Sequence, residues 1–282
     1  MNFIESIVLG IIQGLTEFLP VSSTGHLTLT GKLLNLISAD APEHWTAFIA
    51  VIQLGTLLAV LLYFRTDLIN IAKDFFRDNL YSRKQFANQG MNAKMGWYII
   101  IATIPVVIIG LGFKHIIEGA FTKNLYVISY SLIVLAVILF VAEKTGKFKR
   151  TLSELRWYDA LIIGFAQSLA LIPGSSRSGT TITAGLFLGF DRETAARFSF
   201  LMSIPAVAAS GLLEFYQSLK YLDAGGLVNL ALGTIASAAV GYISIEFLLR
   251  YLKKNSTYVF IIYRIILGVL IMFLLWKGII VP

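Results

Sequence analysis

The chain has 282 residues, of which 57% are hydrophobic and 14% charged, and its formal net charge is +7. This composition excludes an ordinary water-soluble core and predicts segments long enough to cross a bilayer. A soluble protein with this charge would suggest a nucleic-acid partner. In a membrane protein the excess of Lys and Arg in cytoplasmic loops explains the charge, so we expect membrane lipids and no nucleic acid as partners. The absence of cysteine excludes disulfides and thiolate metal sites.

Two short apolar segments open the chain, at residues 3–19 and 24–37, and Pro20 lies between them. Each is shorter than the roughly 20 residues that a helix needs to cross a membrane, which predicts a broken, re-entrant helical hairpin. Longer segments that can each span the bilayer follow at 46–63, 95–113 and 124–142. The loop 64–94 is expected to hold a surface helix around 68–76.

The same pattern then repeats after a basic loop. Short apolar pieces at 159–172 and 179–190 flank a second break, and long segments follow at 194–215, 226–249 and 257–277. We interpret the chain as one integral membrane domain, 1–282, with a first repeat at 1–142 and a second at 159–282. Each repeat crosses the membrane an odd number of times, so the predicted fold is an all-α inverted-topology repeat. In each half, a broken re-entrant hairpin precedes three transmembrane helices.

The distribution of basic residues predicts the orientation. Sixteen of the 23 Lys and Arg fall in the loops 64–94, 143–158, 191–197 and 250–256. Five lie on the other side, at Lys32, Lys114, Lys123, Lys220 and Lys277. The positive-inside rule therefore places these four loops in the cytoplasm and both termini outside.

Residues 13–26, with the sequence QGLTEFLPVSSTGH, bring an acid, hydroxyls and an imidazole into an apolar region. Gln13 and Glu17 are four residues apart, so they share one helix face before Pro20 ends the helix. Ser23 lies where the second arm begins. His26 follows about one turn later, where its imidazole could act as a general base for a hydroxyl or protonate a leaving group.

The second break, at 167–179, repeats Gln, the Leu two residues later, Pro and a pair of Ser in the same order, and adds Arg177. Two helix N-termini meeting near the bilayer midplane would form an anion site, and a guanidinium matches the geometry of phosphate. We expect the following residues to line that site for a phosphorylated ligand: Ser22, Thr24, Gly174, Ser175, Ser176, Ser178 and Thr181. Thr181 has an alternative, because its hydroxyl can bond back to its own helix.

Polar residues at membrane depth are costly and favour a functional interpretation. The alternative is that Glu17 and Arg177 pair only to fasten the two hairpins, but a simple ion pair would not require the hydroxyls around it. Gln53, Gln167 and Glu246 are interpreted as packing hydrogen bonds, and Arg264 is expected to pair with Glu246 or with a carbonyl.

The two motifs, 13–26 and 173–181 (PGSSRSGTT), resemble the signatures of the bacterial undecaprenyl-diphosphate phosphatases, the bacitracin-resistance family, and the resemblance runs the full length. It implies hydrolysis of undecaprenyl diphosphate to the monophosphate and inorganic phosphate, which recycles the lipid carrier of peptidoglycan and so serves cell-wall biogenesis and cell shape. It also implies a bacterial plasma-membrane location with the site open to the outer face.

The resemblance further implies catalytic roles for Ser23, His26, Glu17 and Arg177, supported by Mg²⁺ or Ca²⁺ at Glu17 and Gln13. Because residue 13 is Gln, this motif offers only one carboxylate, and we expect the diphosphate itself to hold most of the ion's contacts. Two mechanisms stay open: attack by Ser23, with His26 or Glu17 taking its proton, or attack by a metal-activated water. The alternative class of protein is a secondary transporter or lipid flippase for an anionic substrate, because transporters also use inverted repeats with broken helices. We also expect a homo-oligomer.

Overall fold

The computed structural model describes residues 1–37, 42–113, 124–220 and 224–281. The α-helices are α1 (Phe3–Phe18), α2 (Ser23–Leu33), α3 (Pro42–Tyr63), α4 (Arg65–Phe76), α5 (Met91–Gly112), α7 (Leu125–Thr145), α8 (Trp157–Ser168), α9 (Arg177–Phe187), α10 (Arg192–Ser218), α11 (Ala224–Leu252) and α12 (Tyr258–Trp276). Short 3₁₀ or π segments are η1 (Arg77–Tyr81), η2 (Phe86–Asn88), η4 (Leu152–Glu154) and η5 (Leu169–Leu171). The predicted all-α class is therefore confirmed for the described residues. Lys114 and Lys123, which are expected on the outer side, lie outside them.

Six helices within the described ranges are long and apolar enough to cross a membrane: α3, α5, α7, α10, α11 and α12. They correspond to the six long segments predicted. The expected loop at 191–197 is wrong, because Asp191 caps α10 by accepting the Thr194 amide at 2.7 Å, so the helix begins at Arg192. Likewise α11 continues to Leu252, inside the expected loop 250–256.

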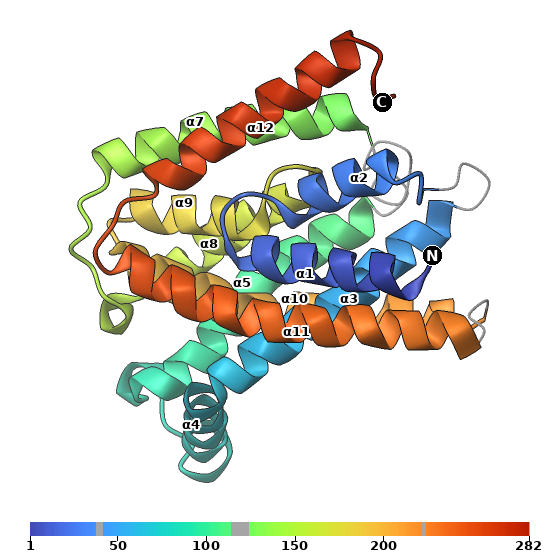
Figure 1. Ribbon diagram of the computed structural model, residues 1–282. Helices are drawn as coiled ribbons and strands as arrows, with labels where there is room; N and C mark the ends of the chain where they lie inside the picture. The colour runs from blue at the N-terminus through green and yellow to red at the C-terminus, as the bar shows by residue number, and fades with distance from the viewer. Residues whose placement is uncertain (38–41, 114–123, 221–223, 282) are drawn as a thin grey trace.

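The helices pack as a bundle in which α7 and α12 lie side by side along one edge (Figure 1). Both chain ends lie at one end of this bundle, and the connections at 146–156 and 253–257 lie at the other (Figure 1). The four helices of the two breaks are short: α1 has 16 residues, α8 has 12, and α2 and α9 have 11 each.

Glycines let these short helices approach their neighbours closely. A Cβ on Gly10 of α1 would lie 2.2 Å from the Gly233 carbonyl oxygen of α11, so only glycine fits there. A Cβ on Gly164 of α8 would lie 2.5 Å from the Ala102 carbonyl oxygen of α5. Helix contact through small residues is the usual packing mode where lipid removes the hydrophobic driving force. Close contact of this kind fixes α1 against α11 and α8 against α5.

The segment 64–94 contains the expected surface helix, observed as α4. Beyond it, the fully buried Asp78 carboxylate accepts from Arg77 and Lys84, both at 3.0 Å, and from the Gly90 amide at 3.3 Å. The hydrogen bond from Lys84 is the main reason that the pKa of Asp78 falls to about 2. This charge cluster fastens the loop between α4 and α5.

Candidate active site

The residue directly before the helix that follows each break has the same unusual backbone conformation. Ser22 precedes α2 with φ 76°, and Ser176 precedes α9 with φ 66°. Each side chain then caps its helix, accepting the Gly25 amide at 3.2 Å and the Gly179 amide at 3.1 Å, respectively. The two capping serines are 154 residues apart, so a position in the second half corresponds to the position 154 residues earlier in the first half. By that correspondence Arg177 is the counterpart of Ser23, the first helical residue of α2.

Glu17 is the centre of the cluster formed at these breaks, and it is 5% exposed. Its Oε2 accepts from the Ser23 hydroxyl at 2.7 Å and from Gln13 Nε2 at 2.9 Å. Its Oε1 accepts from Arg177 Nη2 and Gln53 Nε2, both at 2.8 Å. Four donors, one of them a cation, therefore converge on this one carboxylate. The predicted convergence of Glu17, Ser23 and Arg177 is thus present, with Gln13 beside them.

Gln53 belongs to this cluster although the sequence predicts only a packing role for it. It reaches Glu17 from the middle of α3, and no motif marks it among the polar residues of the spans. A single Gln in an apolar helix indicates a hydrogen bond but not its partner, because the partner depends on how α3 crosses α1.

Arg177 has donors left over after it pairs with Glu17. Its Nε and Nη1 are buried and have no hydrogen-bond partner among the described residues. If this guanidinium served only to join the two breaks, we would expect all of its N–H donors to be hydrogen-bonded to protein acceptors. The free donors indicate capacity for an anionic ligand beside Glu17.

Both ring nitrogens of His26 contact residues other than Ser23. Its Nδ1 lies 2.7 Å from the Ser22 carbonyl oxygen, and its Nε2 lies 2.6 Å from the Tyr263 hydroxyl, whose ring stacks on the imidazole at 5.6 Å. The residue that actually contacts the Ser23 hydroxyl is Glu17. Tyr263 was not identified from the sequence, since it lies in the last span, 237 residues from its partner.

The remaining hydroxyls connect the breaks to each other and to their surroundings. Ser178 donates to the Leu19 carbonyl at 3.1 Å, which joins the two breaks directly. Ser175 pairs with Ser131 at 2.9 Å, whereas Thr24 is exposed. Thr181 bonds back to the Arg177 carbonyl at 2.7 Å and also contacts Ser199 at 2.6 Å, so its hydroxyl is held away from the Glu17 cluster. A ligand role for these residues stays a prediction.

Arg264 is fully buried, and its acceptors within the described residues are all backbone carbonyl groups. Its acceptors are the backbone oxygens of Pro20, Ser131, Leu132, Gly174 and Ser175, at 3.0 to 3.5 Å. Gly179 leaves room for it, because a Cβ there would lie 2.6 Å from Arg264 Nη1. The expected carbonyl pairing is therefore confirmed, whereas Glu246 instead contacts Tyr63 and Arg250.

The described residues do not fit a divalent ion held by Glu17 and Gln13 alone. They contain no group of three or more His, Cys, Asp or Glu side chains suited to a metal. Both Glu17 oxygens are already engaged by donors, and the cation of Arg177 occupies one of them. An ion at this carboxylate would have to displace those donors and overcome the repulsion of the guanidinium.

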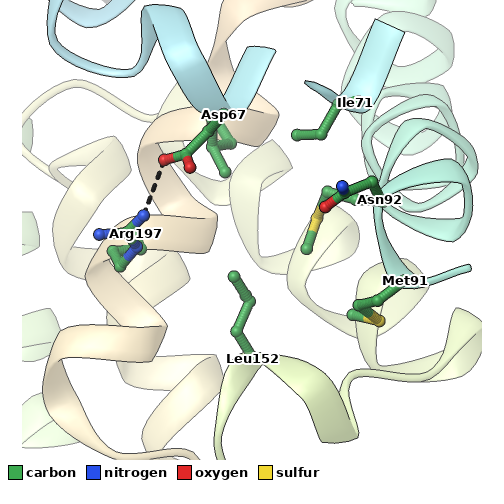
Figure 2. A pocket seen from close by; sticks show the side chains of 8 residues that line it. Asp67, Ile71, Met91, Asn92, Leu152 and Arg197 are labelled. Atoms are coloured by element: carbon green, nitrogen blue, oxygen red, sulfur yellow. Dashed lines mark hydrogen bonds and ion pairs between the residues drawn. The ribbon is translucent and has the colours of Figure 1, made fainter. Parts of the chain in front are cut away.

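A cavity occurs elsewhere, where α4, α5 and α10 meet (Figure 2). It is lined by Asp67, Ile71, Met91, Asn92, Met95, Leu152, Arg197 and Leu201. Asp67 and Arg197 form an ion pair at 2.7 Å on its wall (Figure 2). None of these residues belongs to the Glu17 cluster or carries a predicted role in phosphate chemistry, so we do not assign the active site to this cavity.

The fold and the site together define a multi-pass membrane protein with a polar cluster built from two helix breaks. The family model of the bacitracin resistance protein BacA matches residues 6–270, so the chain belongs to this family. The motif resemblance noted above is thereby confirmed.

Two relatives illustrate the extent of the similarity. A protein of Syntrophobacter fumaroxidans named undecaprenyl-diphosphatase is 54% identical over 277 residues, which cover 98% of this chain and 99% of that protein. An undecaprenyl-diphosphatase of Chloroherpeton thalassium is 52% identical over 287 residues, covering 99% and 98%, respectively. The similarity therefore extends well beyond the two motifs to the whole chain.

Proposed function

We propose that this protein hydrolyses undecaprenyl diphosphate to undecaprenyl phosphate and inorganic phosphate in the bacterial plasma membrane. This activity returns the lipid carrier to peptidoglycan synthesis, and it accounts for the family's link to bacitracin resistance. The observation that carries the proposal is the Glu17 carboxylate, which holds a hydroxyl from one helix break and a guanidinium from the other, in a chain about half identical to proteins named undecaprenyl-diphosphatase.

In the proposed reaction the Ser23 oxygen attacks the terminal phosphorus while its proton passes to Glu17 Oε2, the acceptor that it already contacts at 2.7 Å. The bond to the bridging oxygen breaks, and undecaprenyl phosphate leaves. Water then attacks the phosphorus of the phosphoserine and the bond from phosphorus to the Ser23 oxygen breaks. Glu17 returns the proton to Ser23, and inorganic phosphate leaves. The free Nε and Nη1 donors of Arg177 stabilise the charge on the transferring group.

His26 then has a positioning role in the proposal. It bonds the Ser22 carbonyl and the Tyr263 hydroxyl, and it thereby fixes the strained residue directly before Ser23. Any Mg²⁺ or Ca²⁺ is proposed to arrive on the diphosphate, because Glu17 is already engaged by four donors.

We also propose that the two halves form an inverted-topology repeat with re-entrant hairpins. The support is reciprocal packing: α1 of the first half lies on α11 of the second, and α8 of the second lies on α5 of the first. The short lengths of α2 and α9 favour arms that enter and leave by the same face. The distribution of Lys and Arg supports an orientation with both termini outside, and the family resemblance supports a site open to the outer face.

The proposed surroundings of the substrate are lipid. Apolar side chains are exposed along the outer helices, with Val134 and Val137 on α7 and Ile262 and Ile266 on α12 as examples. The polyprenyl chain can lie against such surfaces without a motif of its own. A homo-oligomer, if formed, would use the same apolar exterior.

The proposal is tested by phosphate release from a polyprenyl diphosphate and magnesium by the purified protein in detergent. The native protein should release phosphate, and Arg177→Ala should lower kcat/KM by about 10² to 10³, the usual cost of removing one donor to a developing negative charge. Arg197→Ala, which removes an ion-paired arginine at the cavity lined by α4, α5 and α10, should stay within about twofold of native. No release by the native protein, or full release by the Arg177 variant, would exclude the proposed activity.

A further inference from the structure

Gln167, near the end of α8, carries a buried side-chain amide. Its side chain is in a residue only 1% exposed, and neither Nε2 nor Oε1 has a hydrogen-bond partner among the described residues. Buried amides are normally satisfied, since an unmade hydrogen bond costs more than a made one gains. Two unsatisfied polar atoms on one buried side chain therefore indicate a group that can bind a ligand.

The internal correspondence of the two halves locates this amide relative to Arg177. Addition of 154 relates Gly10 to Gly164, Gln13 to Gln167, Ser22 to Ser176 and Gly25 to Gly179. The glycines of the first pair both touch a neighbouring helix, and the serines both cap the next helix through the last pair of glycines. Gln167 consequently precedes the start of α9 by the same number of residues as Gln13 precedes the start of α2.

In the first hairpin a carboxylate fills the space between these two points. Glu17 Oε2 accepts from Gln13 at 2.9 Å and from Ser23 at 2.7 Å. In the second hairpin, residue 171 is a leucine within η5, and Arg177 takes the place of Ser23. The second hairpin thus keeps a donor at both positions, while position 171, which corresponds to Glu17, carries no carboxylate.

We propose that Gln167 is a substrate-binding residue that donates its Nε2 hydrogen to a non-bridging oxygen of the diphosphate, together with Arg177 Nε and Nη1. In the second hairpin, the phosphoryl oxygen takes the position that corresponds to the Glu17 carboxylate of the first hairpin. Oε1 of the same amide accepts from a protonated phosphate oxygen, so the residue also favours inorganic phosphate. This inference rests on the proposed function.

A buried amide without a partner should lower the stability of the ligand-free protein. Its hydrogen bond to a bound ligand should raise the stability of the complex. Replacement by an apolar side chain of similar volume removes the unsatisfied atoms, and such replacements are often neutral or stabilising. Gln167→Leu should therefore keep or raise the melting temperature of the empty protein while it weakens phosphate binding. A purely structural amide would behave in the opposite way, since its loss would lower the melting temperature and leave phosphate affinity unchanged.

The experiment compares full-length native protein, Gln167→Leu, Gln167→Glu and Ser168→Ala in detergent. Ser168 is the matched control, because it is the next buried polar residue and already bonds the Gly164 carbonyl of its own helix at 3.4 Å. The measurements are the melting temperature with and without inorganic phosphate, the inhibition constant of phosphate and the KM for a polyprenyl diphosphate.

We expect Gln167→Leu to raise both KM and the phosphate inhibition constant about tenfold, the equivalent of one hydrogen bond to a charged group. Gln167→Glu should raise them more, because a carboxylate repels phosphate, and Ser168→Ala should stay within about twofold. Native values of both constants in Gln167→Leu, or a melting temperature well below native, would overturn the inference. If the native protein released no phosphate, the proposed function would fail, while the phosphate-induced shift in melting temperature would still test Gln167.

Discussion

Ser22 and Ser176 cap two 11-residue helices from the same strained backbone conformation, with φ values of 76° and 66°. Left-handed φ values are uncommon for residues other than glycine, so each serine holds its conformation at a cost that its cap offsets. The same device at both breaks directs the first turns of α2 and α9 into one site. Ser23 and Arg177, the residues that follow, consequently meet on Glu17.

This geometry predicts an order of stability at Ser22. Alanine loses the cap and keeps the strain, so Ser22→Ala should destabilise by about 1 kcal/mol. Ser22→Gly also loses the side-chain cap, but glycine adopts positive φ freely and should cost only a few tenths of a kcal/mol. Thermal unfolding in detergent measures both, and the same order should hold at Ser176. Equal stability of the alanine and glycine variants would contradict this account of the backbone.

Attack by Ser23 predicts a covalent intermediate. Acid quenching during turnover of a polyprenyl diphosphate labelled with ³²P in its terminal phosphoryl group should leave label on Ser23. Ser23→Ala should lose the label and at least about 10³ in kcat, as expected for a nucleophile. Ser244→Ala, which removes a hydroxyl bonded to its own helix, is the control and should keep both. Near-normal turnover by Ser23→Ala would favour the direct attack of water.

Arg264 should be a structural arginine of both breaks. Its removal leaves carbonyl oxygens at Pro20, Gly174 and Ser175 without a buried donor, and each such group costs about 1 to 3 kcal/mol. We therefore expect Arg264→Met to destabilise by about 3 kcal/mol or more in denaturant titrations. The exposed Arg250, which pairs with Glu246, provides the comparison, and Arg250→Met should cost no more than about 1 kcal/mol. Similar losses for the two variants would contradict the bridging role.

The engaged state of Glu17 predicts weak metal binding by the protein alone. Calorimetric titration of Mg²⁺ into the substrate-free protein should show no site tighter than about 1 mM, because a resident high-affinity site would need several free oxygen ligands. The apparent Mg²⁺ requirement of turnover should instead follow the concentration of the diphosphate. A tight site in the native protein that disappears in Glu17→Gln would show that the carboxylate binds the ion directly.

The Asp78 cluster predicts a loop that opens in acid. The pKa of Asp78 is lowered to about 2, below the ordinary 3.8, so its charge stabilises the folded loop at pH values above about 4. That contribution should fall as the pH drops from about 4 to 2, as the carboxylate gains its proton and releases Lys84. Hydrogen exchange of the amides in 77–90, corrected for intrinsic rates, should rise over this range. Asp78→Asn should exchange rapidly at every pH, and an acid response retained in that variant would assign the effect to another group.

Much of the fold was predictable because hydrophobic length is a local property. The six spans follow from runs of apolar residues, and the two breaks follow from Pro20 and Pro173 with the serines after them. The ends of helices were less predictable. Asp191 is the N-cap of α10, but residues 191–197 also have the charged composition of a loop, so the start of this helix was not evident from the sequence.

The site was predictable in membership and less so in its contacts. The sequence by itself determined that Glu17, Ser23 and Arg177 lie at two helix breaks in a membrane, because acid, hydroxyl and guanidinium groups are costly there and need one another. Only the tertiary structure decided that Glu17, and not His26, contacts the Ser23 hydroxyl, and that Gln53 and Tyr263 join the surroundings. The physical reason is that spacing along a chain fixes the face of a helix, whereas the partner on that face depends on how distant helices cross.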